Sequence, residues 1–216
     1  IYNRVLAEKE DAQADVVIGL DEANWLNLQD EVALHDFEPV WAKDLPEAKL
    51  LGNGQFYPFA ESYIFGLYNP DQVSEEDLPN RLEELGQDPD LANKYRIPED
   101  LGGSTHQKII LSILMQYPDE AGELGISDEG WQQVEDYLAN GYQIREDEDH
   151  FELLKDGTLL YDYFHASGTA TRMGEDPDLN VKPINPEYGV FTMTEEIGIL
   201  DKGEDHDYSV CLLYTS

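Results

Sequence analysis

One acidic side chain in the segment 57–69 is surrounded by aromatic residues. Glu61 stands between Phe59 and Tyr63, and Tyr57 precedes them. A carboxylate beside aromatic faces suits an organic cation, because it neutralises the charge and each ring adds roughly 0.5–2 kcal/mol of cation–π attraction. The alternative is an exposed loop acid among rings that belong to a core. The pattern predicts a cation-binding site around Glu61.

A glycine-rich turn offers chemistry for the opposite charge. Gly102, Gly103, Ser104 and Thr105 precede the apolar run 109–115, so the turn leads into the start of a helix. Backbone N–H groups and hydroxyls at such a position can bind a phosphate or a carboxylate. The alternative is a simple turn in which Ser104 caps the helix.

Polar residues also follow a β-branched run near the beginning of the chain. Asp21 ends the apolar segment 15–21, which is typical of a buried parallel strand. The side chain of Asp21 either contacts a ligand or caps the helix that follows. Trp25, on that helix, is a further candidate contact.

The segment 163–167 combines aromatic and polar side chains at the end of a predicted strand. Side chains alternate between the two faces of a strand, so only one parity can face a ligand. The expected contacts are Tyr163, His165 and Ser167, and the alternative parity presents Phe164 and Ala166.

The charge balance excludes several classes of partner. Lys and Arg number 13 against 47 Asp and Glu, which gives a formal net charge of −34. Binding to nucleic acid requires a basic stripe that displaces counterions, and these scattered cations do not form one. An anionic membrane surface is disfavoured for the same reason. Hydrophobic residues make up 41% of the chain, as expected for a globular protein.

Motifs for catalysis and metal binding are missing. The sequence contains no G-x-S-x-G, P-loop, H-E-x-x-H or G-x-G-x-x-G pattern. His150 and His165 have no paired acid at ligand spacing, and the acidic stretch 146–149 indicates a solvated face rather than a calcium loop. We expect no cofactor, no metal site and no enzyme activity. An α/β enzyme of unknown reaction and an interaction protein from a salt-adapted cell are the alternatives.

Short apolar strands alternate with helices along the chain, which predicts an α/β architecture. The expected strands are 15–21, 63–68, 158–164 and 190–193, and the expected helices are 20–27, 80–85, one through 109–115, and one that Ser127 caps and that buries Trp131, Val134 and Leu138.

The order of these segments resembles the extracellular solute-binding proteins of ABC importers, especially the thiamine-binding and iron-binding branches. The resemblance rests on ADVVIGLD at 14–21 and on YPFAESYIFGLYN at 57–69, followed by the turn at 103–105 and by 151–157 leading to 163–167. These matches lie at similar separations between Arg4 and about Asp207.

The resemblance implies a two-lobed α/β fold of the periplasmic-binding type II class, truncated at both ends. Residues 1–62 would form part of lobe 1, 63–187 lobe 2, and 188–210 the return to lobe 1. Crossing strands at 63–69 and near 188–196 would act as a hinge, so that ligand binding closes the lobes. Such a protein is periplasmic or extracellular, or lipid-anchored through a preceding segment. It acts as a monomer that delivers a small solute to ABC permease subunits.

Two departures from the family bear on the ligand. The thiamine-binding branch has a stacking Trp near the positions 146–149, where this chain has acids, and this argues against thiamine itself. Iron-binding relatives use adjacent Tyr ligands, for which Tyr161 and Tyr163 could substitute. The expected solute is cationic or zwitterionic, with ferric ion as the alternative.

Both ends of the sequence differ from those of a typical natural protein. A start at Ile1 within a helix-like stretch indicates a truncated reading frame. The last residues, 211–216, resemble a translated sequencing adaptor, so Cys211 is expected to be non-native.

Overall fold

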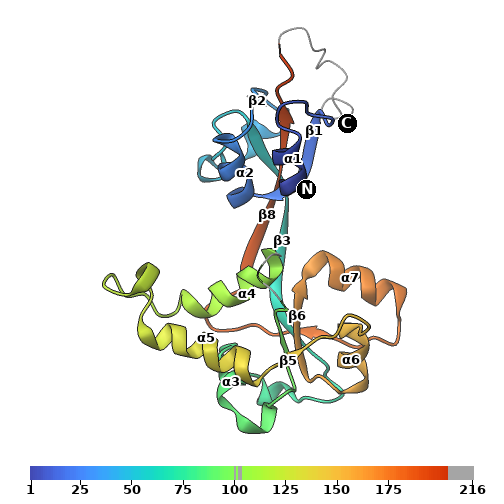
Figure 1. Cartoon of the computed structure of the whole chain (residues 1–216). Coiled ribbons are helices and arrows are strands. Elements are labelled where there is room, and N and C mark those ends of the chain that lie inside the picture. Colours follow the sequence, from blue (N-terminus) through green and yellow to red (C-terminus); the bar gives the residue numbers. More distant parts are fainter. Residues whose placement is uncertain (100, 102–103, 204–216) are drawn as a thin grey trace. The chain divides into compact units, whose positions relative to one another are not determined.

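The computed structural model describes residues 1–99, 101 and 104–203, and gives no side-chain position for Ser104 (Figure 1). The expectations for Gly102, Gly103 and the segment 211–216 lie outside this part of the chain. The chain divides into two compact units, Ile1–Ser62 with Met193–Ser216 as unit 1 and Tyr63–Thr192 as unit 2. Both crossings between the units lie inside strands, β3 (Phe56–Tyr68) and β8 (Phe191–Leu200).

In the described residues, unit 1 contains two α-helices and short strands besides its shares of β3 and β8. Its elements are α1 (Tyr2–Ala7), β1 (Val16–Asp21), α2 (Glu22–Gln29), β2 (Leu34–His35) and the 3₁₀ turns η1 (Ala42–Asp44) and η2 (Glu47–Lys49).

Unit 2 holds most of the helices in the described part of the chain. Its elements are η3 (Glu75–Asp77), α3 (Glu84–Gln87), η4 (Pro89–Leu91), β4 (Arg96–Ile97), α4 (Ser104–Leu114), η5 (Glu123–Gly125), α5 (Asp128–Asn140), β5 (Tyr142–Gln143), α6 (His150–Asp156), β6 (Tyr161–His165), α7 (Ala166–Glu175) and β7 (Lys182–Pro183). No helix in the described residues has the length and apolar character needed to cross a membrane.

The main sheet has the strand order β1-β8-β3-β6. In unit 1, β1 and β2 pair antiparallel with β8. In unit 2, β6 and β7 pair antiparallel with the second half of β3, while β4 and β5 form a separate parallel pair. The expectation that 15–21 forms a parallel strand is therefore wrong. Its apolar run fits any buried strand, and the direction of pairing depends on β8, which lies far away in sequence.

Capping side chains set several helix starts where the sequence predicts them. Asp21 accepts a hydrogen bond from the Asn24 amide at the start of α2, and Ser127 accepts one from the Gly130 amide at the start of α5. Each satisfies an N–H group that has no partner within its helix.

Other boundaries differ from the prediction. No helix spans 80–85, since the chain turns there and only the short α3 follows. The strand expected at 63–68 begins earlier, at Phe56, and the strand expected at 190–193 continues to Leu200. The buried face of α5 consists of Gly130, Val134 and Tyr137, with Trp131 and Leu138 half-buried.

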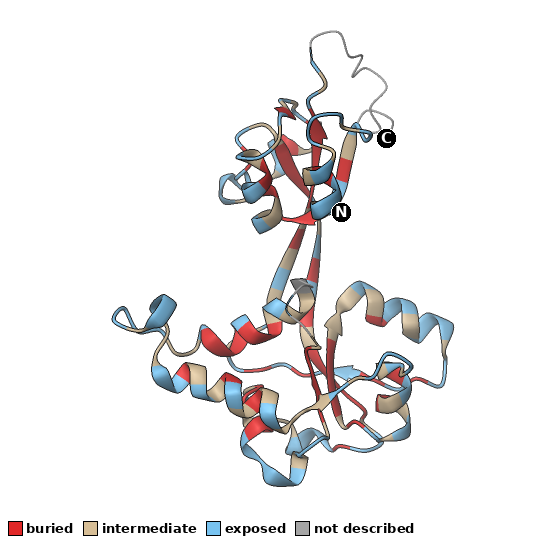
Figure 2. Cartoon of the chain, in the orientation of Figure 1, coloured by how far each residue is buried: buried red, intermediate tan, exposed pale blue. Residues whose placement is uncertain are grey.

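Each unit has its own apolar core, and Figure 2 shows buried residues along the strands of both. In unit 1, Trp25 is fully buried and stacks on Phe56, with ring centroids 5.6 Å apart. The unit 1 core around this pair includes Val5, Val17, Leu20, Leu28, Leu34 and Leu200. The unit 2 core consists of Leu67, Phe151, Leu154, Leu159, Leu179 and Val181.

Trp25→Ala tests this division into two cores. We expect it to lower the free energy of unfolding of unit 1 by about 3–5 kcal/mol, because it removes a buried ring and leaves a cavity. Urea unfolding followed by circular dichroism should then show an early transition for unit 1. Leu124→Ala, at a side chain that is 85% exposed, is the control and should leave the curve unchanged. A single transition shifted as a whole would contradict separate cores.

Candidate functional site

Two predicted contacts, Phe59 and Glu61, line one pocket on unit 1. This Glu61 pocket has a volume of about 450 Å³ and is formed by Trp41, Leu45, Pro46, Lys49, Pro58, Phe59, Ala60 and Glu61. The Phe59 ring is exposed, and the Trp41 indole is held by a 3.1 Å hydrogen bond to the Pro58 carbonyl. The Lys49 ammonium forms an ion pair with Glu61. A cationic solute in this pocket therefore has to compete with Lys49.

The two tyrosines predicted beside Glu61 lie in different surroundings. Tyr57 is buried and packs edge-on against Phe37, with centroids 5.0 Å apart. Burial raises the pKa of Tyr57, and Glu38 and Asp36 add to the effect. Tyr63 is exposed, but neither tyrosine lines the Glu61 pocket. The expected cage of three rings is thus not assembled within unit 1, where Phe59 supplies the ring of the pocket.

The helix start at Asp21 confirms the capping alternative for this residue. One Asp21 carboxylate oxygen accepts from the amide and the side-chain NH₂ of Asn24, at 3.0 and 2.6 Å. Trp25 is not an available contact, because its ring is fully enclosed in the core. The prediction of Trp25 as a contact is wrong for a physical reason: it lies on the face of α2 that covers the sheet.

A buried carboxyl lies behind this helix start. Glu196 of β8 stands opposite Leu20 of β1, and its exposed fraction is 1%. Within the described residues, its Oε2 atom has no hydrogen-bond partner. Burial raises the pKa of Glu196 to about 7, helped by Glu22 and Asp21 and opposed by Lys49. We call Asp21, Glu22 and Glu196 the Glu196 group.

Unit 2 contains a buried polar cluster around Arg96, which we call the Arg96 cluster. It consists of Arg96, Glu99, His106, His150, Asp162 and Tyr163. The Arg96 guanidinium lies over the Tyr163 ring, 4.9 Å from its centroid, and Nη1 is 3.6 Å from Asp162. His150 Nδ1 is 2.5 Å from the other Asp162 oxygen. Four elements therefore meet here: β4, α4, α6 and β6.

The charge of Arg96 is held in place by its neighbours. Burial alone would lower the pKa of Arg96, but Asp162, then Tyr163 and Glu99, raise it overall. Glu99 and His106 lie 3.3 and 3.4 Å from Nη2. In the part of the chain that the structure describes, the Nε atom of Arg96 has no acceptor. The cluster can thus offer a donor to an anionic group near the start of α4.

The remaining predicted contacts of unit 2 lie at two helix starts. Thr105 is half-buried in the first turn of α4. His165 caps α7, its Nδ1 accepting from the Gly168 amide at 3.0 Å, and Ser167 lies 3.0 Å from the same nitrogen. Tyr161 and Tyr163, considered as iron ligands, are both buried, and the Tyr161 hydroxyl donates to the Asp77 carbonyl.

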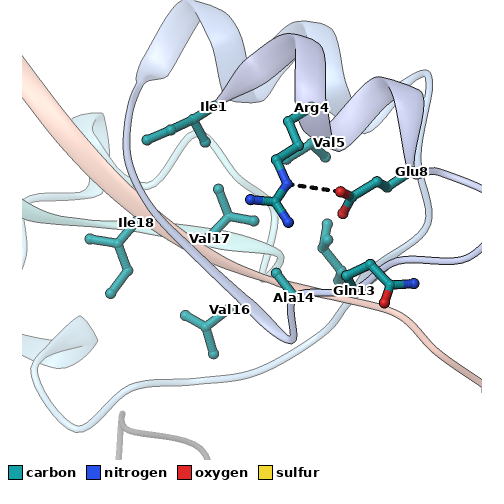
Figure 3. A pocket seen from close by; sticks show the side chains of 10 residues that line it. Ile1, Arg4, Val5, Glu8, Gln13, Ala14, Val16, Val17 and Ile18 are labelled. Carbon is teal, nitrogen blue, oxygen red and sulfur yellow. Dashed lines mark hydrogen bonds and ion pairs between the residues drawn. The ribbon is translucent and has the colours of Figure 1, made fainter.

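A second hollow on unit 1 is independent of these groups. It has a volume of about 340 Å³ and lies between α1 and β1, where Arg4 pairs with Glu8 at 2.8 Å (Figure 3). None of the predicted contacts lines it. Among the residues that the structure describes, no group of three or more His, Cys, Asp or Glu is arranged to hold a metal ion.

Sequence reasoning missed Arg96, Asp162, Lys49 and Glu196. The expectation for His150 concerned only an acid at metal-ligand spacing, and it missed Asp162 as the hydrogen-bond partner of this ring. A buried charge in a strand was the available signal: Asp162 interrupts the apolar run 159–164. Glu196 follows Glu195 in an acid-rich chain, and its burial had no signal in the sequence.

The chain is similar to known transport proteins. It is 30% identical over 200 residues to a protein named "Probable ABC transporter periplasmic-binding protein y4fP" from Sinorhizobium fredii, covering 93% of this chain and 54% of that protein. The chain thus spans about half the length of this curated relative. No protein-family model matches the chain.

Solved structures share the fold. Iron-bound HitA from Pseudomonas aeruginosa matches with a TM-score of 0.74 and 17% identity, over 94% of this chain and 64% of that one. Apo ferric ion-binding protein A from Pasteurella haemolytica matches with a TM-score of 0.74 and 16% identity, over 93% and 63%. These similarities confirm the resemblance expected from the sequence and the expected mixed α/β fold.

Glu196→Gln tests the state of the buried carboxyl. The folded chain keeps this proton up to about pH 7, whereas the unfolded chain releases it near the ordinary pKa of 4.5. Stability therefore falls as pH rises between these values, by at most about 3 kcal/mol. Glu196→Gln should remove this loss, so that the variant is more stable than the wild type at pH 8 and similar to it at pH 5 in urea unfolding. Equal stability differences at the two pH values would contradict this assignment.

Asp162→Asn tests the Arg96 cluster. It removes the counter-charge of a buried guanidinium, so we expect a loss of about 3–5 kcal/mol in the free energy of unfolding. Asp90→Asn, at an exposed position of unit 2, should stay within about 0.5 kcal/mol of the wild type. Similar effects of the two substitutions would show that Asp162 does not balance Arg96.

Proposed function

We propose that this chain is part of the substrate-binding component of an ABC importer, which captures a small cationic or zwitterionic solute and presents it to a membrane permease. The observation that supports this most directly is the 30% identity over 200 residues to a periplasmic-binding protein. The fold shared with HitA and with ferric ion-binding protein A is consistent with it.

The proposed contacts of unit 1 follow from its exposed polar and aromatic groups. Phe59 and Glu61 would contact the solute in the Glu61 pocket. Tyr63, which begins unit 2, would be a separate contact through its exposed ring. The Asp21 carboxylate would attract a bound cation electrostatically rather than by direct contact, since one of its oxygens already accepts a hydrogen bond from the Asn24 amide. Tyr57 would support Phe37 rather than touch the solute.

The proposed contacts of unit 2 suit a negatively charged group. Ser104, Thr105, His165 and Ser167 lie at helix starts, where backbone N–H groups favour anions. The Arg96 guanidinium, held over Tyr163, adds a positive charge near α4. Taken separately, the acids of unit 1 suit a cationic group and this cluster of unit 2 suits an anionic group, and a zwitterionic solute carries both.

The remaining features of the proposal follow from the similarity to binding proteins. The protein would act outside the cytoplasmic membrane, with a lipid anchor supplied by a segment outside this sequence. It would be a monomer, would not bind nucleic acid, and would bind its solute reversibly without changing a covalent bond. Ferric ion is the second candidate, because the similar structures include iron-binding proteins.

A thermal-shift panel tests the proposed function. A solute that binds only the folded state raises the melting temperature further as its concentration increases, because the stabilisation grows with the logarithm of concentration. We expect a concentration-dependent rise with at least one of thiamine, its phosphates, polyamines, betaines, aminophosphonates and ferric ion. Mass spectrometry should then recover the solute unchanged after incubation. A chemically altered solute would indicate an enzyme, and no shift with any member would count against the proposal.

Glu61→Ala tests the Glu61 pocket. We expect it to weaken binding of the solute found in the panel by more than about tenfold, because it removes the carboxylate that faces a bound cation. Glu31→Ala is a matched control, since Glu31 also forms an exposed ion pair on unit 1, with Lys9 at 3.5 Å. An unchanged dissociation constant in Glu61→Ala, measured by calorimetry, would remove Glu61 from the site.

A further inference from the structure

We propose that the Glu196 group is a subsite for a primary ammonium group of the solute, and that Glu196 gives up its proton to solvent when this group binds. The inference rests on the proposed function and specifies which chemistry of solute unit 1 recognises. The proton balance is simple, because the carboxyl of Glu196 becomes a carboxylate and the released proton passes to the buffer.

The position of Glu196 separates it from ordinary surface acids. Thr194, Glu196 and Gly198 share one face of β8, because side chains alternate along a strand. A Cβ built on Gly198 would lie 2.5 Å from the Trp25 ring, so this is the face that α2 covers. Glu196 is thus enclosed near the start of α2, with its Oε2 atom lacking a hydrogen bond among the described residues.

Capping explains Asp21 and Glu22 but does not explain Glu196. Acids are favoured at the beginning of a helix, where they satisfy N–H groups and complement the helix dipole. Asp21 caps α2, and Glu22 is in its first turn. Glu196 belongs to a strand, and a buried carboxyl without a hydrogen bond costs stability. A cation bound beside Glu196 would offset this loss of stability.

Neighbours of both signs act on Glu196. Glu22 and Asp21 raise its pKa and Lys49 lowers it, and Lys49 is also paired with Glu61 and lies 3.5 Å from Thr194 Oγ1. With the pKa of Glu196 at about 7, its carboxyl is half-protonated near neutral pH. A second positive charge beside Asp21 and Glu22 would lower this pKa and ionise Glu196.

An ammonium group fits these acids better than a charge without donors. Its three N–H bonds can reach several carboxylate oxygens at once. Glu22 is only half-buried, so it provides access from the surface, whereas Asp21 and Glu196 lie deeper. Glu22 is therefore the member of the group that solvent reaches most readily.

Calorimetry with putrescine tests the subsite on the whole chain. Putrescine keeps both ammonium groups charged between pH 6 and pH 8, so any released proton comes from the protein. We expect affinity to rise about tenfold from pH 6 to pH 8, as linkage to one carboxyl with a pKa of about 7 requires. Binding heats measured at pH 6 in phosphate and in Bis-Tris, which buffers at this pH, should differ by the heat of transferring about one proton to the buffer.

Substitutions distinguish the role of Glu196 in binding from the roles of neighbouring acids. Glu196→Gln should abolish both proton release and the pH dependence, and should weaken binding at pH 8 about tenfold. Glu195→Gln, one position along the same strand and on its other face, is the matched control and should behave as the wild type. If Glu196→Gln does not fold, Glu22→Gln gives a second test, because it should move the midpoint of the pH dependence below that of the wild type.

The outcomes distinguish this proposal from the proposed function. Putrescine binding without proton release, or without sensitivity to Glu196→Gln, would overturn the subsite. So would the failure of putrescine to bind while another member of the thermal-shift panel binds, and in that case the importer function would stand. If ferric ion alone binds and requires Glu196, the ammonium class is wrong. If nothing binds, both proposals fail.

Discussion

The structure depends on two strands, β3 and β8, that each run from one unit into the other. β3 places Phe56 against Trp25 in unit 1 and Leu67 in the core of unit 2. β8 likewise begins in unit 2 and ends with Leu200 in the core of unit 1. A shift of one residue in either strand would turn buried side chains to the opposite face. The register of β8 against β1 and β2 in unit 1, and that of β3 against β6 and β7 in unit 2, therefore decide which side chains of these strands are buried, Glu196 among them.

The buried acids of the two units have different charged neighbours. Asp162 in unit 2 has Arg96 and His150 as partners, so its charge is balanced inside the Arg96 cluster. Glu83, also buried, is 2.9 Å from Arg81 and accepts from the Tyr117 hydroxyl. Glu196 has two acids and the shared Lys49 around it, and its pKa rises instead. Burial alone does not single out Glu196, but burial without a balancing charge does.

Local signals in the sequence predicted local structure. The caps at Asp21 and Ser127 and the helix through 109–115 needed only neighbouring residues, and the structure has all three. Pairing between distant segments could not be predicted in this way. The antiparallel partner of β1 is β8, and the partners Arg96 and Asp162 lie on β4 and β6. The first half of β3 was not predicted as a strand. It contains Pro58, which has no backbone N–H donor, and proline disfavours strand interiors.

The ion pair between Lys49 and Glu61 bears on which acids define the solute. The sequence favoured Glu61 because aromatic residues surround it, but its charge is already matched by Lys49 in the folded chain. An entering cation must displace Lys49 before it can pair with Glu61, so Glu61 attracts it less strongly than an unpaired carboxylate would. The Glu196 group combines three acids with a buried oxygen, Glu196 Oε2, for which the described residues supply no hydrogen bond. If the solute is cationic, as we propose, this buried oxygen is a stronger physical basis for selecting it than the aromatic residues around Glu61.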